Sequence, residues 1–126
     1  MAATQPTKIA QIAIAVRDLE RAKAFYRDTL GLKWIADAPP GLSFFQCGEV
    51  RLMLSQPEGP ETAGNSILYY GVEDAGAAHE ALVAKGVVFE HPPHVIGRLG
   101  DTEVTLGVCR DSEGNLLGLM SERSVG

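Results

Sequence analysis

An internal repeat is the sequence feature that most constrains what this chain can fold into. Residues 9–32, IAQIAIAVRDLERAKAFYRDTLGL, return in weaker form as residues 65–87, NSILYYGVEDAGAAHEALVAKGV, and one offset of 56 residues aligns Asp18 with Asp74. The repeat predicts two copies of one strand–helix unit. Because duplicated modules bring equivalent strands around a shared cleft, the same position in each copy can be tested for chemistry.

The spacing of apolar residues predicts the elements of each copy. Apolar residues alternate with smaller ones from Ile12 to Val16, as in a half-buried strand, and recur at helical spacing over residues 19–30. Asp18 is expected to cap this helix at its start, and Gly31 to end it. The second copy repeats the plan with a strand over 66–72, a cap at Asp74, a helix over 75–85 and a stop at Gly86.

Further strands are predicted after each helix. They cover residues 42–47, 50–55, 87–90, 103–109 and 115–120. A two-residue turn in the first hairpin would place Phe44 opposite Met53. The same turn would place Gln46 opposite Arg51. The polar, Pro- and Gly-rich residues 56–65 are expected to join the two modules.

The second hairpin is expected to turn at residues 111–114, which would place Cys109 beside Leu116. Before it, residues 90–101 (EHPPHVIGRLGD) are rich in Pro and Gly and too long for a tight turn. We expect this segment to form a lid or rim loop that carries His94.

Composition excludes several classes of function. A chain of 126 residues with a net charge of −5 and no concentration of Lys and Arg fits one globular domain and disfavours a nucleic-acid partner. Cys47 and Cys109 lie in apolar segments, as reduced core thiols do. No signal-peptide pattern and no apolar run of about 18 residues is found, so we expect a cytoplasmic protein with no membrane partner.

The strings VRDLERAKAFYRDTLGL and RDSEGNLLGLMSE, with the duplicated module, resemble the vicinal oxygen chelate superfamily of glyoxalase I, bleomycin-resistance and extradiol-dioxygenase proteins. The resemblance covers residues 9–122. It implies an α+β fold in which two βαβββ modules, about 8–56 and 65–122, form a cupped eight-stranded mixed sheet with helices outside. It also implies one domain over 1–126, a homodimer and a ligand bound inside the cup.

The resemblance also implies where a metal would bind. In metal-dependent members each module gives two ligands to one divalent cation, and these positions map onto Gln11, Met53, Ile67 and Gly118. Three of the four lack an oxygen or nitrogen side-chain donor, and one neutral amide is a weak site alone. We therefore expect no metal and no cofactor.

The strand phases predict an apolar cavity with a few polar groups, as is usual for small-molecule sites. The candidate ligand-binding residues are Gln11, Phe44, Gln46, Arg51, Met53, Ile67, Tyr69, Cys109 and Gly118. The aliphatic members could equally be packed core. Gln11 could bind a ligand, or it could form a hydrogen bond to a neighbouring strand or to Tyr69. Arg51 could pair with a ligand carboxylate, or with Glu49 or solvent.

Three side chains are candidates for a catalytic role. Tyr69 could donate to a developing oxyanion or simply cap a polar group in the core. His94 could act as an acid or base near neutral pH unless it is a solvated loop residue. Cys109 is better explained as an inert core thiol than as a nucleophile, because no basic neighbour is placed to form its thiolate.

Two functions compete on this basis. The first is metal-independent binding of a small, largely apolar organic molecule, comparable to antibiotic sequestration by bleomycin-resistance proteins. The second is a glyoxalase-like lyase or isomerase that uses Tyr69, Gln11 and His94 for general acid–base chemistry. A pure interaction module ranks last, because no distinctive apolar stripe is exposed.

Overall fold

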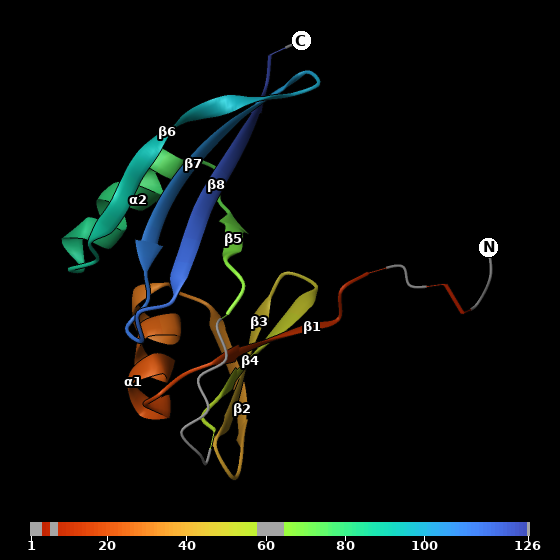
Figure 1. Ribbon diagram of the computed structural model, residues 1–126, viewed down its shortest axis with the longest axis vertical. Coiled ribbons are helices and arrows are strands. Elements are labelled where there is room, and N and C mark those ends of the chain that lie inside the picture. Colours follow the sequence, from red (N-terminus) through yellow and green to blue (C-terminus); the bar gives the residue numbers. More distant parts are fainter. Residues whose placement is uncertain (1–3, 6–7, 58–64, 126) are drawn as a thin grey trace. The chain divides into compact units, whose positions relative to one another are not determined.

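The computed structural model describes residues 4–5, 8–57 and 65–125 of the chain (Figure 1). The chain divides into two compact units, Met1–Asn65 and Ser66–Gly126. Both units have the element order strand, helix, three strands. The prediction of two βαβββ modules is confirmed. Most of the predicted linker lies outside the described residues.

The first unit forms a four-stranded mixed sheet in the order β1-β4-β3-β2. Its elements are β1 (Gln11–Ala15), α1 (Leu19–Ala24), η1 (Phe25–Thr29), β2 (Lys33–Ala38), β3 (Leu42–Cys47) and β4 (Val50–Ser55). Strand β1 pairs parallel to β4, and the other pairs are antiparallel. The helix ends in one π-helical turn, η1, in which the Leu30 N–H donates to the Phe25 carbonyl at 2.8 Å.

The second unit repeats this topology in the order β5-β8-β7-β6. Its elements are β5 (Leu68–Gly71), α2 (Ala75–Ala84), β6 (Phe89–Leu99), β7 (Thr102–Arg110) and β8 (Leu116–Ser124). Strand β5 pairs parallel to β8, as β1 does to β4. The two sheets therefore share one connectivity.

The two helices start in the same way. The Asp18 carboxylate accepts from the Arg21 N–H at 3.1 Å, and the Asp74 carboxylate accepts from the Ala77 N–H at 3.1 Å. Both residues are extended, as N-caps require, and satisfy a helix N–H that has no partner within the helix. The caps lie at the spacing that the repeat predicts.

Each unit has its own apolar core between its helix and one face of its sheet. In the first unit the Tyr26 and Phe45 rings lie 6.4 Å apart, and both side chains are at most 1% exposed, together with Leu54. In the second unit Leu117 and Leu119 are the equivalent large buried side chains. Burial of each such side chain stabilises the fold by about 1.5–3 kcal/mol.

One predicted loop is a strand. Residues 89–99 form β6, the edge strand of the second sheet, so the expected lid over 90–101 is wrong for most of its length. Proline has an extended φ and lacks an N–H, and both properties are tolerated on an edge strand and at bulges. The pairing of β6 with β7 shifts between His91 and His94, on either side of Pro92-Pro93.

The register of the last hairpin also differs from the prediction. Cys109 pairs with Leu117 rather than with Leu116, because the turn includes Asn115. The Asp111 carboxylate accepts from the Glu113 and Asn115 N–H groups, each at 2.8 Å. Since side chains alternate along a strand, this shift of one residue moves Cys109 to the opposite face of the sheet.

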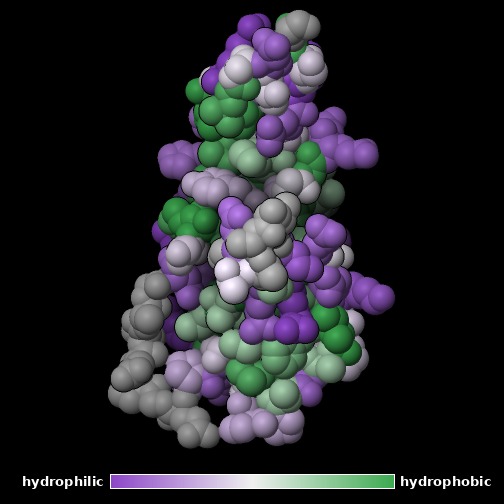
Figure 2. Space-filling model, turned by 90° about the vertical axis from the view of Figure 1, so that its right-hand side faces the viewer, coloured by the Kyte–Doolittle hydropathy of each residue, from purple (hydrophilic) through white to green (hydrophobic). Residues whose placement is uncertain are grey.

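No described helix is long and apolar enough to cross a membrane. On the face drawn in Figure 2, hydrophobic and hydrophilic side chains are interspersed.

Candidate functional site

The sheet of the first unit has a face that packs against α1 and an opposite face, here called the distal face. Strand register places Ile12, Ile14, Phe45, Leu52 and Leu54 on the helix side, and their burial agrees with this. The alternate residues therefore lie on the distal face. They include all five candidates from this unit, Gln11, Phe44, Gln46, Arg51 and Met53.

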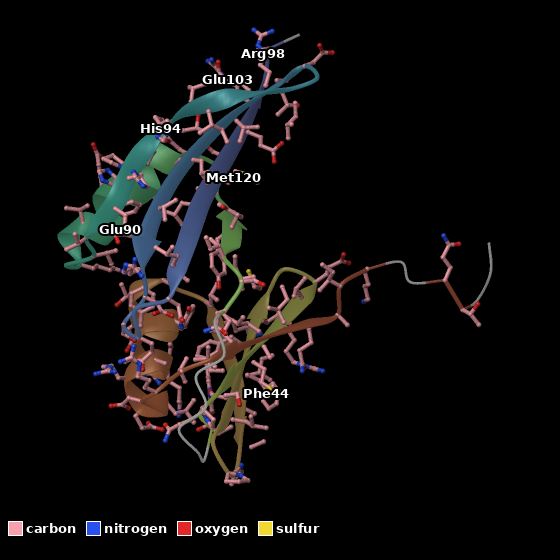
Figure 3. The ribbon with its side chains drawn as sticks, in the orientation of Figure 1. Phe44, Glu90, His94, Arg98, Glu103 and Met120 are labelled. Atoms are coloured by element: carbon pink, nitrogen blue, oxygen red, sulfur yellow. The ribbon has the colours of Figure 1, made fainter. Side chains whose placement is uncertain are left out.

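Gln11 and Arg51 form the best-defined polar contact on the distal face. The Arg51 Nε–H donates to Gln11 Oε1 at 2.6 Å, and the Gln11 amide nitrogen lies 3.8 Å from Met53 Sδ. The Arg51 guanidinium also lies 5.8 Å from the centre of the Phe44 ring (Figure 3 labels Phe44). Gln11 therefore bonds to a neighbouring strand, which was one of its two predicted alternatives. Arg51 faces Gln11 rather than Glu49.

Register extends this contact into two rows across the sheet. The first row runs over all four strands and holds two cations and two amides, Lys33, Gln46, Arg51 and Gln11. The next row is apolar and holds Ala36, Phe44, Met53 and Ala13. Phe44 does face Met53, and Gln46 does face Arg51, as the two-residue turn predicts. The distal face is thus a cationic row beside an apolar one.

Sequence reasoning missed Lys33. This side chain is exposed and in register with Gln46, so it belongs to the same row as Arg51. The pairing of β2 with β3 contains a bulge between Trp34 and Ala36. The bulge interrupts the alternation of side chains along β2, so the sequence pattern does not show which face Lys33 shares. The only available signal was the third strand that the family resemblance implies for each module.

In the second unit Tyr69 lies over Gly118 on the neighbouring strand. The two residues are in register, and a Cβ on Gly118 would meet the Tyr69 ring, with Cε1 at 2.7 Å. The ring thus fills the space where another residue would have its side chain. Ile67 precedes β5 and is exposed. Tyr69 as a whole is 49% exposed.

The structure does not bring Tyr69 and His94 together. They lie on β5 and β6, the two edges of one sheet, with β8 and β7 between them. Strands are spaced by about 4.8 Å, so these edges are about 14 Å apart. His94 is exposed on β6 (Figure 3), and its Nδ1 lies 3.0 Å from the Pro92 carbonyl oxygen. No proton can pass directly between the two side chains in this arrangement.

Cys109 lies away from the other candidates of its unit. Its side chain is fully buried on the face that carries Leu117 and Leu119, whereas Gly118 and Tyr69 lie on the other face. Burial, with a smaller effect of Asp111, raises the pKa of the thiol to about 11. The assignment of Cys109 to the ligand-binding face is wrong because it depended on the shifted register.

The four positions that hold a metal in metal-dependent relatives do not fit a cation here. The only oxygen donor, Gln11 Oε1, already accepts from the positively charged Arg51. Met53 offers a thioether, Ile67 has no donor, and the side-chain space of Gly118 is taken by Tyr69. The described residues contain no group of three or more His, Cys, Asp or Glu side chains that could hold a metal ion. Hard and borderline cations need several such donors.

The chain belongs to the Glyoxalase/Bleomycin resistance protein/Dioxygenase superfamily, whose sequence profile matches residues 8–119. It is 29% identical over 102 residues to the YraH protein of Bacillus subtilis (strain 168), which covers 69% of this chain and 79% of YraH.

Solved structures agree with the fold. A lactoylglutathione lyase from Agrobacterium tumefaciens is 25% identical and matches with a TM-score of 0.74 over 93% of this chain and 95% of the other. A superfamily member from Alicyclobacillus acidocaldarius is 19% identical and matches with a TM-score of 0.70 over 94% and 93% of the two chains. The two structures support the βαβββ fold, and they leave the reaction of this chain to be argued from its own residues.

Proposed function

We propose that this protein is a metal-independent member of the superfamily that binds and sequesters a small, largely apolar organic molecule. The observation that carries the proposal is the Arg51–Gln11 bond of 2.6 Å. Gln11 Oε1 is the one side-chain oxygen at the four metal positions, and the Arg51 guanidinium already occupies it. A divalent ion at Gln11 would be repelled by the guanidinium beside it and would find no second oxygen or nitrogen donor at Met53.

The surroundings of this contact support ligand binding. Phe44 and Met53 are only partly buried and lie beside Arg51, whose two terminal nitrogens have no partner among the described residues. Binding sites for small molecules combine apolar area with a few oriented polar groups in this way. We also propose that the protein acts as a homodimer, which light scattering would test as a molar mass of twice the 13.4 kDa chain.

The decisive experiment measures ligand binding with metal removed. Protein treated with a strong chelator is screened by thermal shift against small apolar compounds, and hits are measured by calorimetry with and without added Ni²⁺, Zn²⁺, Mn²⁺ and Fe²⁺. We expect saturable binding that added metal does not change, with the compound recovered intact. Tight retention of one ion per chain, measured by elemental mass spectrometry, would contradict the proposal.

Gln11→Ala is the variant that tests the role of the Arg51–Gln11 contact in ligand binding. Because Gln11 holds the Arg51 guanidinium in place, its loss should weaken binding by about tenfold while the protein stays folded. Glu49→Gln is the control, since Glu49 is exposed at the β3–β4 turn and lies outside both rows.

A second candidate function is a glyoxalase-like lyase or isomerase. The observation that favours it is the 25% identity to a lactoylglutathione lyase over nearly the whole chain. Since Tyr69 and His94 lie on opposite edges of their sheet, such an enzyme would use them separately. A turnover rate with a bell-shaped pH profile that His94→Ala abolishes would support it, and an unchanged rate in that variant would remove His94 from the mechanism.

A further inference from the structure

The polar row of the distal face carries positive charge that no described carboxylate of its unit neutralises. Arg51 and Lys33 both lie in this row, and within residues 8–57 and 65–125 no carboxylate forms an ion pair with either. The protein as a whole carries a net charge of −5, so carboxylates were available. The row is therefore a local exception to the charge of the molecule.

The second unit provides an internal comparison. Its equivalent row has Arg110 in register with Leu116, and the Arg110 Nε–H donates to Glu90 at 2.7 Å. Arg110 also donates to the Gly114 carbonyl at 2.7 Å. Arg110 takes on β7 the place that Gln46 has on β3, and Leu116 takes the place of Arg51. The equivalent row of the second unit thus holds a cation paired with a carboxylate, whereas Arg51 and Lys33 pair with no described carboxylate.

The geometry of Arg51 leaves one edge of its guanidinium for a ligand. Its Nε–H donates to Gln11, and its Cζ lies 5.8 Å from the Phe44 ring centre, within the range of a cation–π contact. The described structure gives its two terminal nitrogens no partner. These nitrogens can donate two parallel hydrogen bonds to one carboxylate. Gln11, anchored toward Met53, sets the direction of that edge.

The apolar row lies directly beside these donors. Phe44 and Met53 are cross-strand partners, and each lies two residues along its strand from the Gln46–Arg51 pair. A ligand that places an anionic group on Arg51 would therefore lay its next carbons against Phe44 and Met53. Lys33, at the end of the row, adds long-range attraction for the same charge.

We propose, building on the proposed function, that the ligand of this face is an amphipathic organic carboxylate. Its carboxylate pairs with the terminal nitrogens of Arg51, and its apolar body packs on Phe44 and Met53. Arg51 thus takes over the recognition of a negatively charged oxygen that a metal ion performs in metal-dependent relatives. Gln11 is a positioning residue for Arg51.

The test compares an acid with its uncharged isostere. Binding of 4-phenylbutanoate and of 4-phenylbutanamide is measured by calorimetry and by NMR titration on chelator-treated protein. We expect the acid to bind about tenfold or more tightly than the amide, as a charge-assisted bidentate pair requires. The acid should perturb the amide resonances of β3 and β4.

Two variants assign the effect to Arg51. Arg51→Gln should remove the preference, so that acid and amide bind within about twofold of each other, and Arg51→Lys should keep part of it. Arg123→Gln removes the same charge from a residue already paired with Glu103 at 2.8 Å, and should keep the full preference. Arg51 is exposed, so its substitution is not expected to unfold the protein, and thermal melting checks this.

The outcomes separate this inference from the proposed function. If acid and amide bind equally in the wild type, or if Arg51→Gln keeps the preference, the carboxylate inference is overturned while metal-independent binding stands. If neither compound binds, the carboxylate inference is overturned. The proposed function is then tested by whether uncharged compounds bind chelator-treated protein in the thermal-shift screen. Retention of a divalent ion would overturn the proposed function itself.

Discussion

Tyr69 and Gly118 illustrate how one residue can exclude another across a sheet. A Cβ at position 118 would lie within 2.7 Å of Tyr69 Cε1, so Gly118→Ala should cost about 1–3 kcal/mol of unfolding free energy through overpacking. In a Tyr69→Ala background the same change should cost little, because the ring is gone. Urea unfolding of both single variants and the double variant measures this coupling.

Gly71 is the control for this cycle. It lies on β5 with Tyr69, and a Cβ there would meet nothing within 4 Å. Gly71→Ala should therefore be neutral or slightly stabilising, because alanine restricts the unfolded chain. Equal effects of Gly118→Ala with and without the Tyr69 ring would mean that the ring moves aside freely. A side chain at position 118 could then be accommodated beside Tyr69.

At the scale of the elements, α1 and β2 are held together by a cluster of polar side chains. The Lys23 ammonium donates to Asp37 at 2.7 Å, and the Trp34 indole N–H donates to the same carboxylate at 3.1 Å. The Lys23 side chain is only 11% exposed, so removal of Asp37 would leave a largely buried charge with Glu20, at 3.5 Å, as its remaining carboxylate partner. The hydrogen bond from Lys23 is the main reason why the pKa of Asp37 falls to about 2.

This pKa predicts a specific acid response. Asp37 is held ionised in the folded state, so its contribution to stability is complete above its ordinary pKa of 3.8 and is lost as the pH falls toward 2. The effect should be about 1 kcal/mol or less, because Asp37 is partly exposed and screened by solvent. Unfolding free energies of the wild type and Asp37→Asn, measured between pH 5 and 2, should show a shallower acid decline in the variant.

Glu49→Gln serves as the control for the unfolding free energies measured between pH 5 and 2. Glu49 is exposed and has no ion pair among the described residues. This variant should follow the wild type at all pH values. An Asp37→Asn curve that parallels the wild type would show that the Lys23 contact does not act on stability.

Sequence reasoning succeeded where local patterns decide the element and failed where tertiary contacts do. The caps at Asp18 and Asp74 and the register of Phe44 with Met53 follow from short-range rules, and all were predicted correctly. The face of Cys109 depended on whether Asn115 belongs to a strand or a turn, and hydrogen bonds to Asp111 decide that. The strand β6 depends on pairing with β7, which permits prolines that local patterns assign to a loop.

The same contrast applies to the candidate site. Five of its first-unit residues share one face because strand alternation is a local property. The Arg51–Gln11 bond and the place of Lys33 in the row required the pairing of strands that are distant in sequence. The chemistry that we infer for the distal face comes from that pairing.

At the scale of the whole molecule, the sequence predicts a single domain, and the chain divides into two compact units. Whether these units unfold together is the question that decides the prediction. If the chain is one cooperative domain, damage to the core of one unit must destabilise the other. Leu119 is 1% exposed in the second unit, so Leu119→Ala should cost about 2–5 kcal/mol. Trp34 is the single tryptophan of the chain and lies in the first unit, so its fluorescence reports on that unit alone.

We expect Leu119→Ala to lower the urea midpoint of the Trp34 fluorescence transition by about 1 M or more, in step with circular dichroism of the whole chain. Leu99→Ala is the control, because Leu99 is 72% exposed in the same unit and should leave both midpoints in place. A Trp34 midpoint that stays at the wild-type value while circular dichroism shows two steps would mean that the units unfold independently. The distal face of the first unit would then be stable whatever happens to the second, and ligand binding there should survive Leu119→Ala.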